Sequence, residues 1–292
     1  MLRWVLAACC ALAAGLALAA GPKLPLWEAS KPDGATVYLF GSIHVCNAGC
    51  FPLPEKVLRR LEASQVLVVE LDPKRPEAQG KLLAAAMLPA GQRLGDLLSA
   101  ADWQALVGAA RELGLPAEAL APLQPWMAGM LLSVASAQQA GYEIAQGVDM
   151  ALMQRAAQQG MTLEELESIE EQIAALGAGS LREQQQALRL TVDLVRGGRA
   201  SSYLAAMISA WRSGNAAQVN RLLNEGLPKG STQTRALIDE RNVVMSQRIV
   251  RSMQDGRSRF VVVGMAHLVG PQGVPALLGR QGYRVRQLGV EE

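Results

Sequence analysis

The stretch Tyr38-Leu-Phe-Gly-Ser-Ile-His44 is an apolar run that ends in a glycine, two further residues and a histidine. A second stretch with the same frame, Val261-Val-Val-Gly-Met-Ala-His267, lies near the other end of the chain. The apolar runs are rich in β-branched and aromatic residues, which favour strands. A proline-containing loop and a helical pattern follow each run, at 55–63 and at 276–280. We interpret these stretches as two equivalent strand–loop–helix units.

Three runs predict buried strands: 36–40, 66–69 and 260–263. Each run is apolar on both faces, which is typical of a parallel sheet with helices on both sides. A fourth segment, 283–288, alternates between polar and apolar residues and predicts an edge strand. Because these strands come from the two ends of the chain, the last strands must return beside the first.

The chain between these strands has an almost wholly helical pattern. Thr162-Leu-Glu-Glu165 matches a capping box, which predicts the start of a helix. The other predicted helices are 94–113, 125–140, 148–159, 181–196, 200–213, 216–223 and 235–253. We therefore expect an α/β fold, with a mainly parallel central sheet formed by both chain ends and a large helical insertion, about 72–256, inside one domain at 20–292.

The composition permits a sizeable core and argues against a nucleic-acid partner. Half of the 292 residues are apolar, only 4% are aromatic, and the formal net charge is +2. Binding to a phosphate backbone needs clustered positive charge, and the sequence has no run of five or more basic residues. We expect a peptide or small-molecule substrate instead.

The N-terminal residues 1–19 have the pattern of a cleaved signal peptide. Arg3 provides the positive region, 5–17 are apolar, and Ala17-Leu18-Ala19 fits a cleavage site. The apolar run is shorter than the roughly 18–20 residues of a membrane helix. We expect a periplasmic or secreted protein with no stable membrane span after cleavage. The alternatives are an uncleaved anchor and a lipoprotein, since Leu6-Ala7-Ala8-Cys9 resembles a lipobox.

Two cysteines remain after removal of the signal, Cys46 and Cys50. An exported protein meets an oxidising compartment, so we expect a disulfide between them. Metal binding by this pair is the weaker alternative.

Three polar residues follow the three buried strands: His44, Glu70 and His267. Ligands bind outside the carboxyl ends of parallel strands in open α/β sheets, so these side chains are expected to face one crevice. Two imidazoles and a carboxylate form a common set of metal ligands, which zinc uses with an open position for water and non-haem iron uses as a facial triad. A bound divalent ion lowers the pKa of water from about 15.7 to near 7, which supplies a nucleophile.

Structural alternatives exist for each of these residues. A lone histidine is usually a surface or hydrogen-bonded residue, and Glu70 also suits an ion pair with an arginine or a contact with a helix N-terminus. Other chemistries lack their motifs, because the sequence contains no Gly-x-Ser-x-Gly elbow, no Gly-x-Gly-x-x-Gly fingerprint, no Walker loop and no His-Glu-x-x-His helix.

At these residues the sequence resembles the TraB/GumN family (TraB/PrgY/GumN), which is related to the Tiki metalloproteases. The segments that carry the resemblance are Leu26-Trp27, 37–44, Val68-Val69-Glu70, 146–149, Leu166-Glu167, Glu240-Arg241-Asn242 and 262–268. The two Gly-x-x-His elements are the most specific of them, and the resemblance extends over most of the mature chain.

The resemblance implies a metal-dependent, peptidase-like activity with manganese or cobalt as the ion. Zinc is the ion that two imidazoles and a carboxylate suggest without the resemblance. It carries over His44, Glu70 and His267 as metal and catalytic residues. Arg241 resembles the helical arginine of the family, which would hold a carboxylate ligand, the substrate or an oxyanion. An ion pair on an exposed helix is the alternative. Asp149 and Glu167 are candidates for substrate or supporting contacts, or are solvated helix residues.

We therefore expect a metal-dependent hydrolase, in which Glu70 ligates the ion or acts as general base. The alternative from a different class is a periplasmic binding protein that sequesters a peptide signal or haem. A third alternative is a family member that keeps only a structural metal.

Overall fold

A computed structural model describes residues 22–32, 36–226 and 230–291, and the predicted signal peptide lies outside these residues. The six strands are β1 Lys23–Ser30, β2 Thr36–Ser42, β3 Val66–Val69, β4 Thr162–Glu165, β5 Arg259–Gly264 and β6 Arg284–Gly289. They form one sheet in the order β4-β3-β5-β2-β1-β6. The pairs β4–β3, β3–β5 and β5–β2 are parallel, while β1 is antiparallel to β2 and to β6.

The predicted α/β class is confirmed, including the return of the chain's end to its beginning. β5 lies between β2 and β3, and all of its residues are buried. β6 pairs with β1 at the edge of the sheet, as its alternating pattern predicted. The strand β1 was not predicted. Its apolar centre is short, and the strand exists because β2 and β6 pair with its two sides.

The predicted helix start at Thr162 is wrong. Residues 162–165 form strand β4, which pairs with β3. The capping boxes that do begin helices lie further on, at Ser168 with Glu171 and at Ser180 with Glu183. Pairing with a buried strand overrides a local helix signal in so short a segment.

The helices mostly agree with the predicted ranges, but 94–113 is split in two, 235–253 is divided into a π-helix and an α-helix, and α2, α5 and α8 were not predicted. The α-helices are α1 Glu55–Glu62, α2 Pro76–Ala86, α3 Leu94–Leu97, α4 Ala100–Glu112, α5 Ala117–Leu120, α6 Pro125–Gln139, α7 Val148–Gln158, α8 Ile169–Leu176, α9 Leu181–Arg196, α10 Ala200–Arg212, α11 Ala216–Gly226, α12 Thr232–Thr234, α13 Arg241–Ser252 and α14 Val274–Arg280. The short helices are η1 Ala48–Cys50, η2 Ile144–Gln146, the π-helix η3 Arg235–Glu240, η4 Met253–Asp255 and η5 Met265–Leu268.

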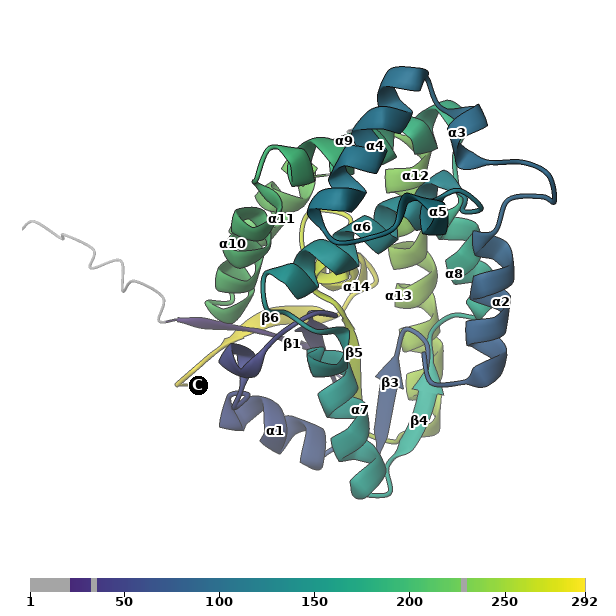
Figure 1. Cartoon of the computed structure of the whole chain (residues 1–292). Helices are drawn as coiled ribbons and strands as arrows, with labels where there is room; N and C mark the ends of the chain where they lie inside the picture. The colour runs from purple at the N-terminus through teal and green to yellow at the C-terminus, as the bar shows by residue number, and fades with distance from the viewer. Residues whose placement is uncertain (1–21, 33–35, 227–229, 292) are drawn as a thin grey trace, which may run out of the picture.

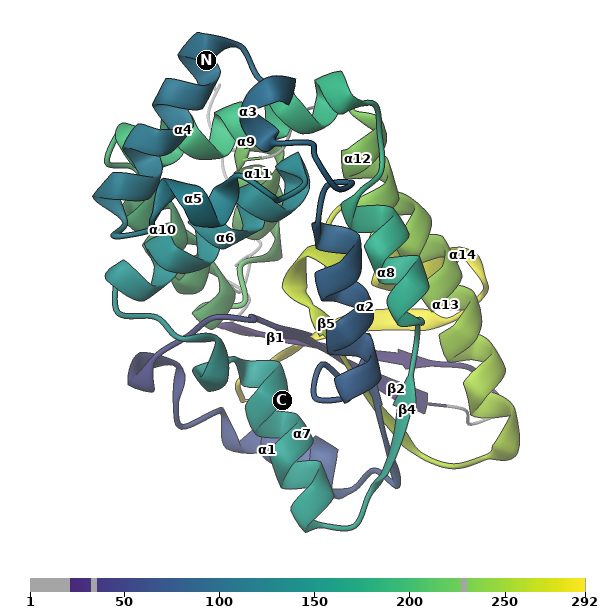
Figure 2. The ribbon, with the colours of Figure 1, turned by 45° about the vertical axis from the view of Figure 1, so that its right-hand side comes forward.

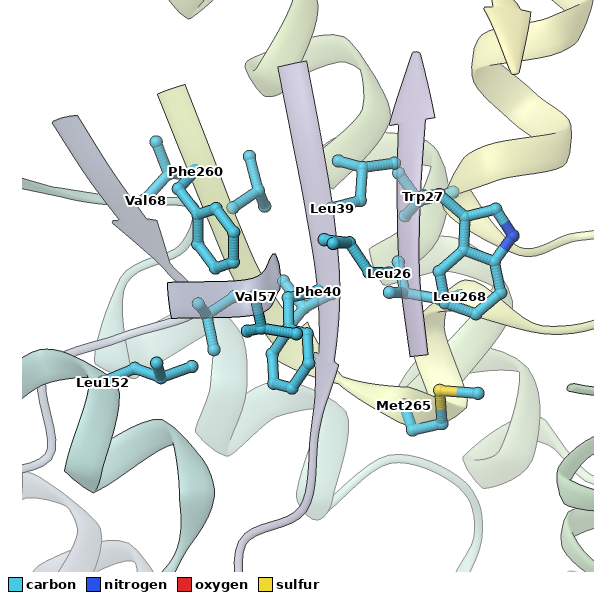
Figure 3. Packing of buried hydrophobic residues seen from close by; sticks show 14 of the residues in the cluster. Leu26, Trp27, Leu39, Phe40, Val57, Val68, Leu152, Phe260, Met265 and Leu268 are labelled. Atoms are coloured by element: carbon cyan, nitrogen blue, oxygen red, sulfur yellow. The ribbon is translucent and has the colours of Figure 1, made fainter. Parts of the chain in front are cut away.

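Helices cover both faces of the sheet. α1 and α7 lie on one side, and α13 and α14 lie on the other (Figures 1 and 2). The core at the sheet includes a stacked pair, Phe40 of β2 and Phe260 of β5, whose ring centroids are 6.1 Å apart (Figure 3). Trp211 of α10 meets Phe40 edge-on and donates its Nε1–H to the carbonyl of Gly41 at 2.7 Å. This contact ties the helical region to β2.

The helical middle has a hydrophobic core of its own. Buried leucines of α3, α4, α6 and α9 pack together away from the sheet, among them Leu94, Leu106, Leu132 and Leu188. In the part of the chain that the structure describes, no helix combines the length and the apolar character that crossing a membrane requires.

Candidate functional site

The predicted site residues lie at one edge of the sheet, where the parallel strands β2, β3 and β5 end. Glu70 directly follows β3, His267 lies in η5 directly after β5, and His44 comes two residues after β2. The ends of β2 and β5 are level, because Ser42 pairs with Gly264, and β3 ends two residues earlier, where Val69 pairs with Val262. The sheet therefore brings together three side chains from distant parts of the chain, as the sequence predicted.

Gly264, the last residue of β5, marks the point where they meet. Its backbone N–H donates to Oε1 of Glu70 at 2.6 Å. A Cβ on this residue would lie 3.1 Å from Nε2 of His44, 3.3 Å from Oε1 of Glu70 and 3.8 Å from Cδ2 of His267. A side chain here would crowd His44 and Glu70 and touch His267, so the glycine keeps open the space that the three groups share.

His267 is buried and held in one orientation. Its Nδ1 lies 2.7 Å from Oδ1 of Asn242, and the amide nitrogen of Asn242 donates to the carbonyl of Gln272 at 2.9 Å. Asn242 therefore presents its oxygen to the ring, so Nδ1 carries the proton and the lone pair of Nε2 faces Glu70. Nε2 is 3.8 Å from Oε1 of Glu70. Burial lowers the pKa of His267 to about 4, because it outweighs the attraction of Glu70.

His44 is oriented by a carboxylate. Its Nδ1 lies 3.0 Å from Oδ2 of Asp149, the second residue of α7, while 61% of its side chain is exposed. Desolvation lowers the pKa of His44, but the hydrogen bond to Asp149 and the charges of Glu70 and Asp149 outweigh this effect and raise the pKa to about 9. Asp149 thus has a defined partner instead of being a solvated helix residue.

The backbone around His44 is fixed to the start of α7. Val148 donates its N–H to the carbonyl of Ile43 at 2.9 Å, and Cys46 forms a two-way backbone bridge with Glu143. A Cβ on Gly147 would lie 2.6 Å from the carbonyl oxygen of His44, so only glycine permits this approach. The histidine and its carboxylate are therefore positioned by one pair of loops.

Arg241 joins Glu70 to Glu167. Its guanidinium donates to Oε2 of Glu70 at 2.7 Å, to both oxygens of Glu167 at 2.8 and 2.6 Å, and to the carbonyl of Leu237 at 3.1 Å. These bonds use four of its five N–H groups. Of the alternatives left open by the sequence, the structure has Arg241 in largely buried ion pairs with two carboxylates, Glu70 and Glu167.

The charges around Glu70 keep it ionised. Burial raises the pKa of Glu70, but the charges of His267, His44 and Arg241 and the Gly264 N–H outweigh it and lower the pKa to about 2. Burial raises the pKa of Glu167, and the bonds from Arg241 oppose that shift.

The donor set fits a divalent ion, although the ions themselves are not part of the structure. Within the described ranges, no group of three or more His, Cys, Asp and Glu side chains already has the spacing of a metal site. Two ligand atoms at about 2.0–2.2 Å from one ion lie at most about 4.4 Å apart. The 3.8 Å between His267 Nε2 and Glu70 Oε1 is within that limit. Both imidazoles also have Nδ1 held by an oxygen, as metal-binding histidines do.

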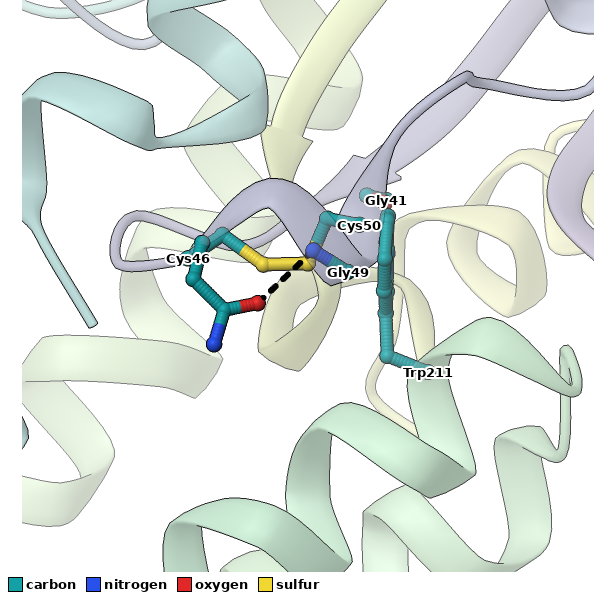
Figure 4. Close-up of a disulfide and its surroundings, with 6 residues drawn as sticks. Gly41, Cys46, Gly49, Cys50 and Trp211 are labelled. Carbon is teal, nitrogen blue, oxygen red and sulfur yellow. Dashed lines mark hydrogen bonds between the residues drawn. A yellow bond between two sulfur atoms is a disulfide. The ribbon is translucent and has the colours of Figure 1, made fainter. Parts of the chain in front are cut away.

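The loop after His44 contains the predicted disulfide. Cys46 and Cys50 are joined, both are buried, and the side chain of Asn47 accepts a hydrogen bond from the Gly49 N–H between them (Figure 4). The pair therefore closes the loop and does not contribute to the ligand set.

Asn242 is the functional side chain that the sequence analysis quoted without giving it a role. It lies on the buried face of α13 with Met245, Ser246 and Ile249. A fully buried amide on the apolar face of an amphipathic helix needs a polar partner, and that pattern is the signal that could have found it.

Comparison with known proteins gives one family and two curated relatives. The profile of the TraB/PrgY/gumN family matches residues 25–287. The chain is similar to the uncharacterized protein YbaP of Escherichia coli (strain K12) and to the same protein of Shigella flexneri. Each is 28% identical over 256 residues, which is 87% of this chain and 92% of the relative. No solved structure matches the chain.

Proposed function

This chain belongs to the TraB/PrgY/gumN family, and we propose that it is a metal-dependent hydrolase with peptidase-like activity. In this proposal His44, Glu70 and His267 hold a single divalent ion at the carboxyl end of the sheet. The observation that carries it is the arrangement around Gly264, where both imidazoles have Nδ1 held by an oxygen and Nε2 of His44, Oε1 of Glu70 and the ring of His267 surround one point.

The ion, when bound, would supply Lewis acidity and a water of lowered pKa. The residues of the chain prepare the site for it. Asn242 and Asp149 fix the two imidazole rings, and the Gly264 N–H and Arg241 each hold one oxygen of Glu70. Glu70 thus has little freedom to move, which suits a ligand better than a group that swings to carry a proton. Arg241 acts by positioning Glu70.

The donor atoms limit the choice of ion, and the N-terminal pattern and the disulfide indicate the compartment. Two nitrogens and one carboxylate oxygen suit zinc, manganese and cobalt, so we propose one of these three. The N-terminal pattern at 1–19 and the disulfide in the loop after β2 support an exported, periplasmic or secreted protein.

Elemental analysis of the purified protein tests the proposed site. We expect about one equivalent of Mn²⁺, Co²⁺ or Zn²⁺ after supplementation, and less than a tenth of that in His44→Ala and His267→Ala. Glu70→Gln should lower the affinity for the ion at least tenfold. Glu240→Gln is the matched control, because that carboxylate is exposed and lies beside Arg241 in sequence. Equal loading of wild type and both histidine variants would exclude the site.

A peptide-library assay with each ion then separates hydrolysis from binding. Metal-dependent cleavage that both histidine variants lose supports the hydrolase. Saturable peptide binding without cleavage under any ion would instead support a binding protein. A Soret band in the purified protein would indicate a haem carrier.

A further inference from the structure

A cavity of about 480 Å³ adjoins the candidate site on the side of His267. Two of its lining residues adjoin that histidine. Asn242 accepts a hydrogen bond from its ring, and Ala266 precedes it in the chain. The remaining walls come from α11, from the π-helix η3 and from the loop after η5. Its volume is in the range of small-ligand sites, which are about 300–1,000 Å³.

The walls combine apolar side chains with a few polar ones. Leu223, Ile238 and Val269 provide apolar surface, and the amides of Asn220 and Gln272 lie among them. Such a mixture suits an organic group that carries a polar end, because the apolar walls bind its body and the polar groups fix its orientation.

The part-buried charge in this cavity is a carboxylate. Asp239 lines the cavity and is half-buried, and no hydrogen bond or ion pair joins its side chain to another described residue. Arg235, one helical turn earlier, also lines the cavity but is exposed. Solvent screens an exposed charge far more than a partly buried one. The cavity therefore favours a cation over an anion.

We infer that this cavity binds the free amino terminus of a peptide, with Asp239 pairing with the α-ammonium group and the apolar walls receiving the first side chain. This inference rests on the proposed peptidase-like function of the adjoining site. An ammonium group is a compact donor of three hydrogen bonds, for which the carboxylate of Asp239 and the side-chain oxygens of Asn220 and Asn224 are the acceptors in the cavity wall. Because Asn242 and Ala266 of the cavity wall adjoin His267, the protein would select peptides by their amino end next to the candidate site.

Calorimetric titration with small probes tests this recognition. L-leucine amide has the ammonium group without a carboxylate, N-acetyl-L-leucine amide has neither, and N-acetyl-L-leucine has only the carboxylate. We expect the purified protein at pH 7 to bind L-leucine amide at least tenfold more tightly than either acetylated probe. Asp239→Asn should reduce that affinity at least tenfold. Asp96→Asn, which removes an exposed carboxylate on α3, should leave it within twofold.

The titration is independent of hydrolysis, so the two proposals fail separately. Unchanged affinity in Asp239→Asn, or stronger binding of N-acetyl-L-leucine that Arg235→Gln abolishes, overturns the inferred amino-terminal site even when the metal is bound. Asp239-dependent binding of L-leucine amide in a protein that takes up no metal would support this cavity and exclude the proposed function. Equal binding in metal-free and metal-loaded protein shows that the amine does not simply ligate the ion.

Discussion

The side chains at the candidate site are oriented by hydrogen bonds to residues that are themselves fixed by further hydrogen bonds. Asn242 is the clearest example, because its oxygen accepts from His267 and its nitrogen donates to the carbonyl of Gln272. Neither bond can form with the amide turned over, so the side chain has one useful orientation. The carbonyl of Gln272 therefore orients the imidazole of His267 through the amide of Asn242.

Replacing Asn242 by alanine should weaken metal binding without unfolding the protein. Loss of a partner that orients a metal-binding histidine typically costs 10–100-fold in metal affinity. Two buried hydrogen bonds are also lost, at about 1–3 kcal/mol of stability. Titration with Zn²⁺ or Mn²⁺ measures the first effect and urea unfolding measures the second. Asn242→Asp keeps the acceptor and should recover part of the affinity, whereas wild-type affinity in the alanine variant would show that the ring needs no support.

At this scale the sequence predicted the residues that follow strands and named Asp149, Glu167 and Arg241 as candidates, but it did not pair each histidine with its partner. His44, Glu70 and His267 each follow an apolar strand, so their positions depend only on strand order. The partnership of His44 with Asp149 depends on how two loops meet, and that of His267 with Asn242 depends on where α13 packs. Such contacts come from tertiary packing, which a local pattern does not encode.

Among the elements, α8 and α13 show how side chains couple helices across the molecule. Glu171 accepts the backbone N–H of Ser168 at the start of α8 and receives two hydrogen bonds from Arg248 of α13, at 2.7 and 2.6 Å. The sequence had placed a capping box at 162–165, where the chain forms β4. The same four-residue signal occurs at both places, and only pairing with β3 distinguishes them.

Glu171→Gln should lower the free energy of unfolding by about 1 kcal/mol at neutral pH, since its bidentate pair is partly exposed. The bonds from Arg248 and the Ser168 N–H lower the pKa of Glu171 from 4.5 to about 2. Its stabilisation is therefore present above pH 4.5 and is lost as the pH falls through 2. Urea unfolding across this range should show the difference from wild type disappear. The exposed Glu118→Gln is the control, and a pH-independent difference would refute the coupling.

For the whole molecule, the decisive feature is the central position of β5. This strand comes from the end of the chain, yet it separates two strands from the beginning. The sequence predicted this closure because apolar strands at both ends need a common sheet. It did not predict the separate core of the helical middle, since helical periodicity shows which face is buried but not against what.

Phe260→Ala should destabilise the whole fold by about 3–5 kcal/mol, because the ring is fully buried and stacks on Phe40 across the β2–β5 junction. Chemical denaturation followed by circular dichroism measures the loss. Leu163→Ala, on the exposed strand β4, should change stability by less than about 1 kcal/mol. Similar losses of stability in the two variants would mean that the β2–β5 junction contributes no more to stability than the edge strand does.

The position of β5 in the sequence also determines when the candidate site can form during synthesis. His44 and Glu70 are synthesised first, and Gly264, whose N–H is supplied by the strand that separates β2 from β3, follows Glu70 by 194 residues. Until then the two early strands lack their shared neighbour, and a gap of this kind closes only by a contact between distant parts of the chain, which is slow. A chain that has not yet incorporated β5 therefore lacks the Gly264 N–H and His267, so the candidate site can assemble only after this strand has been made.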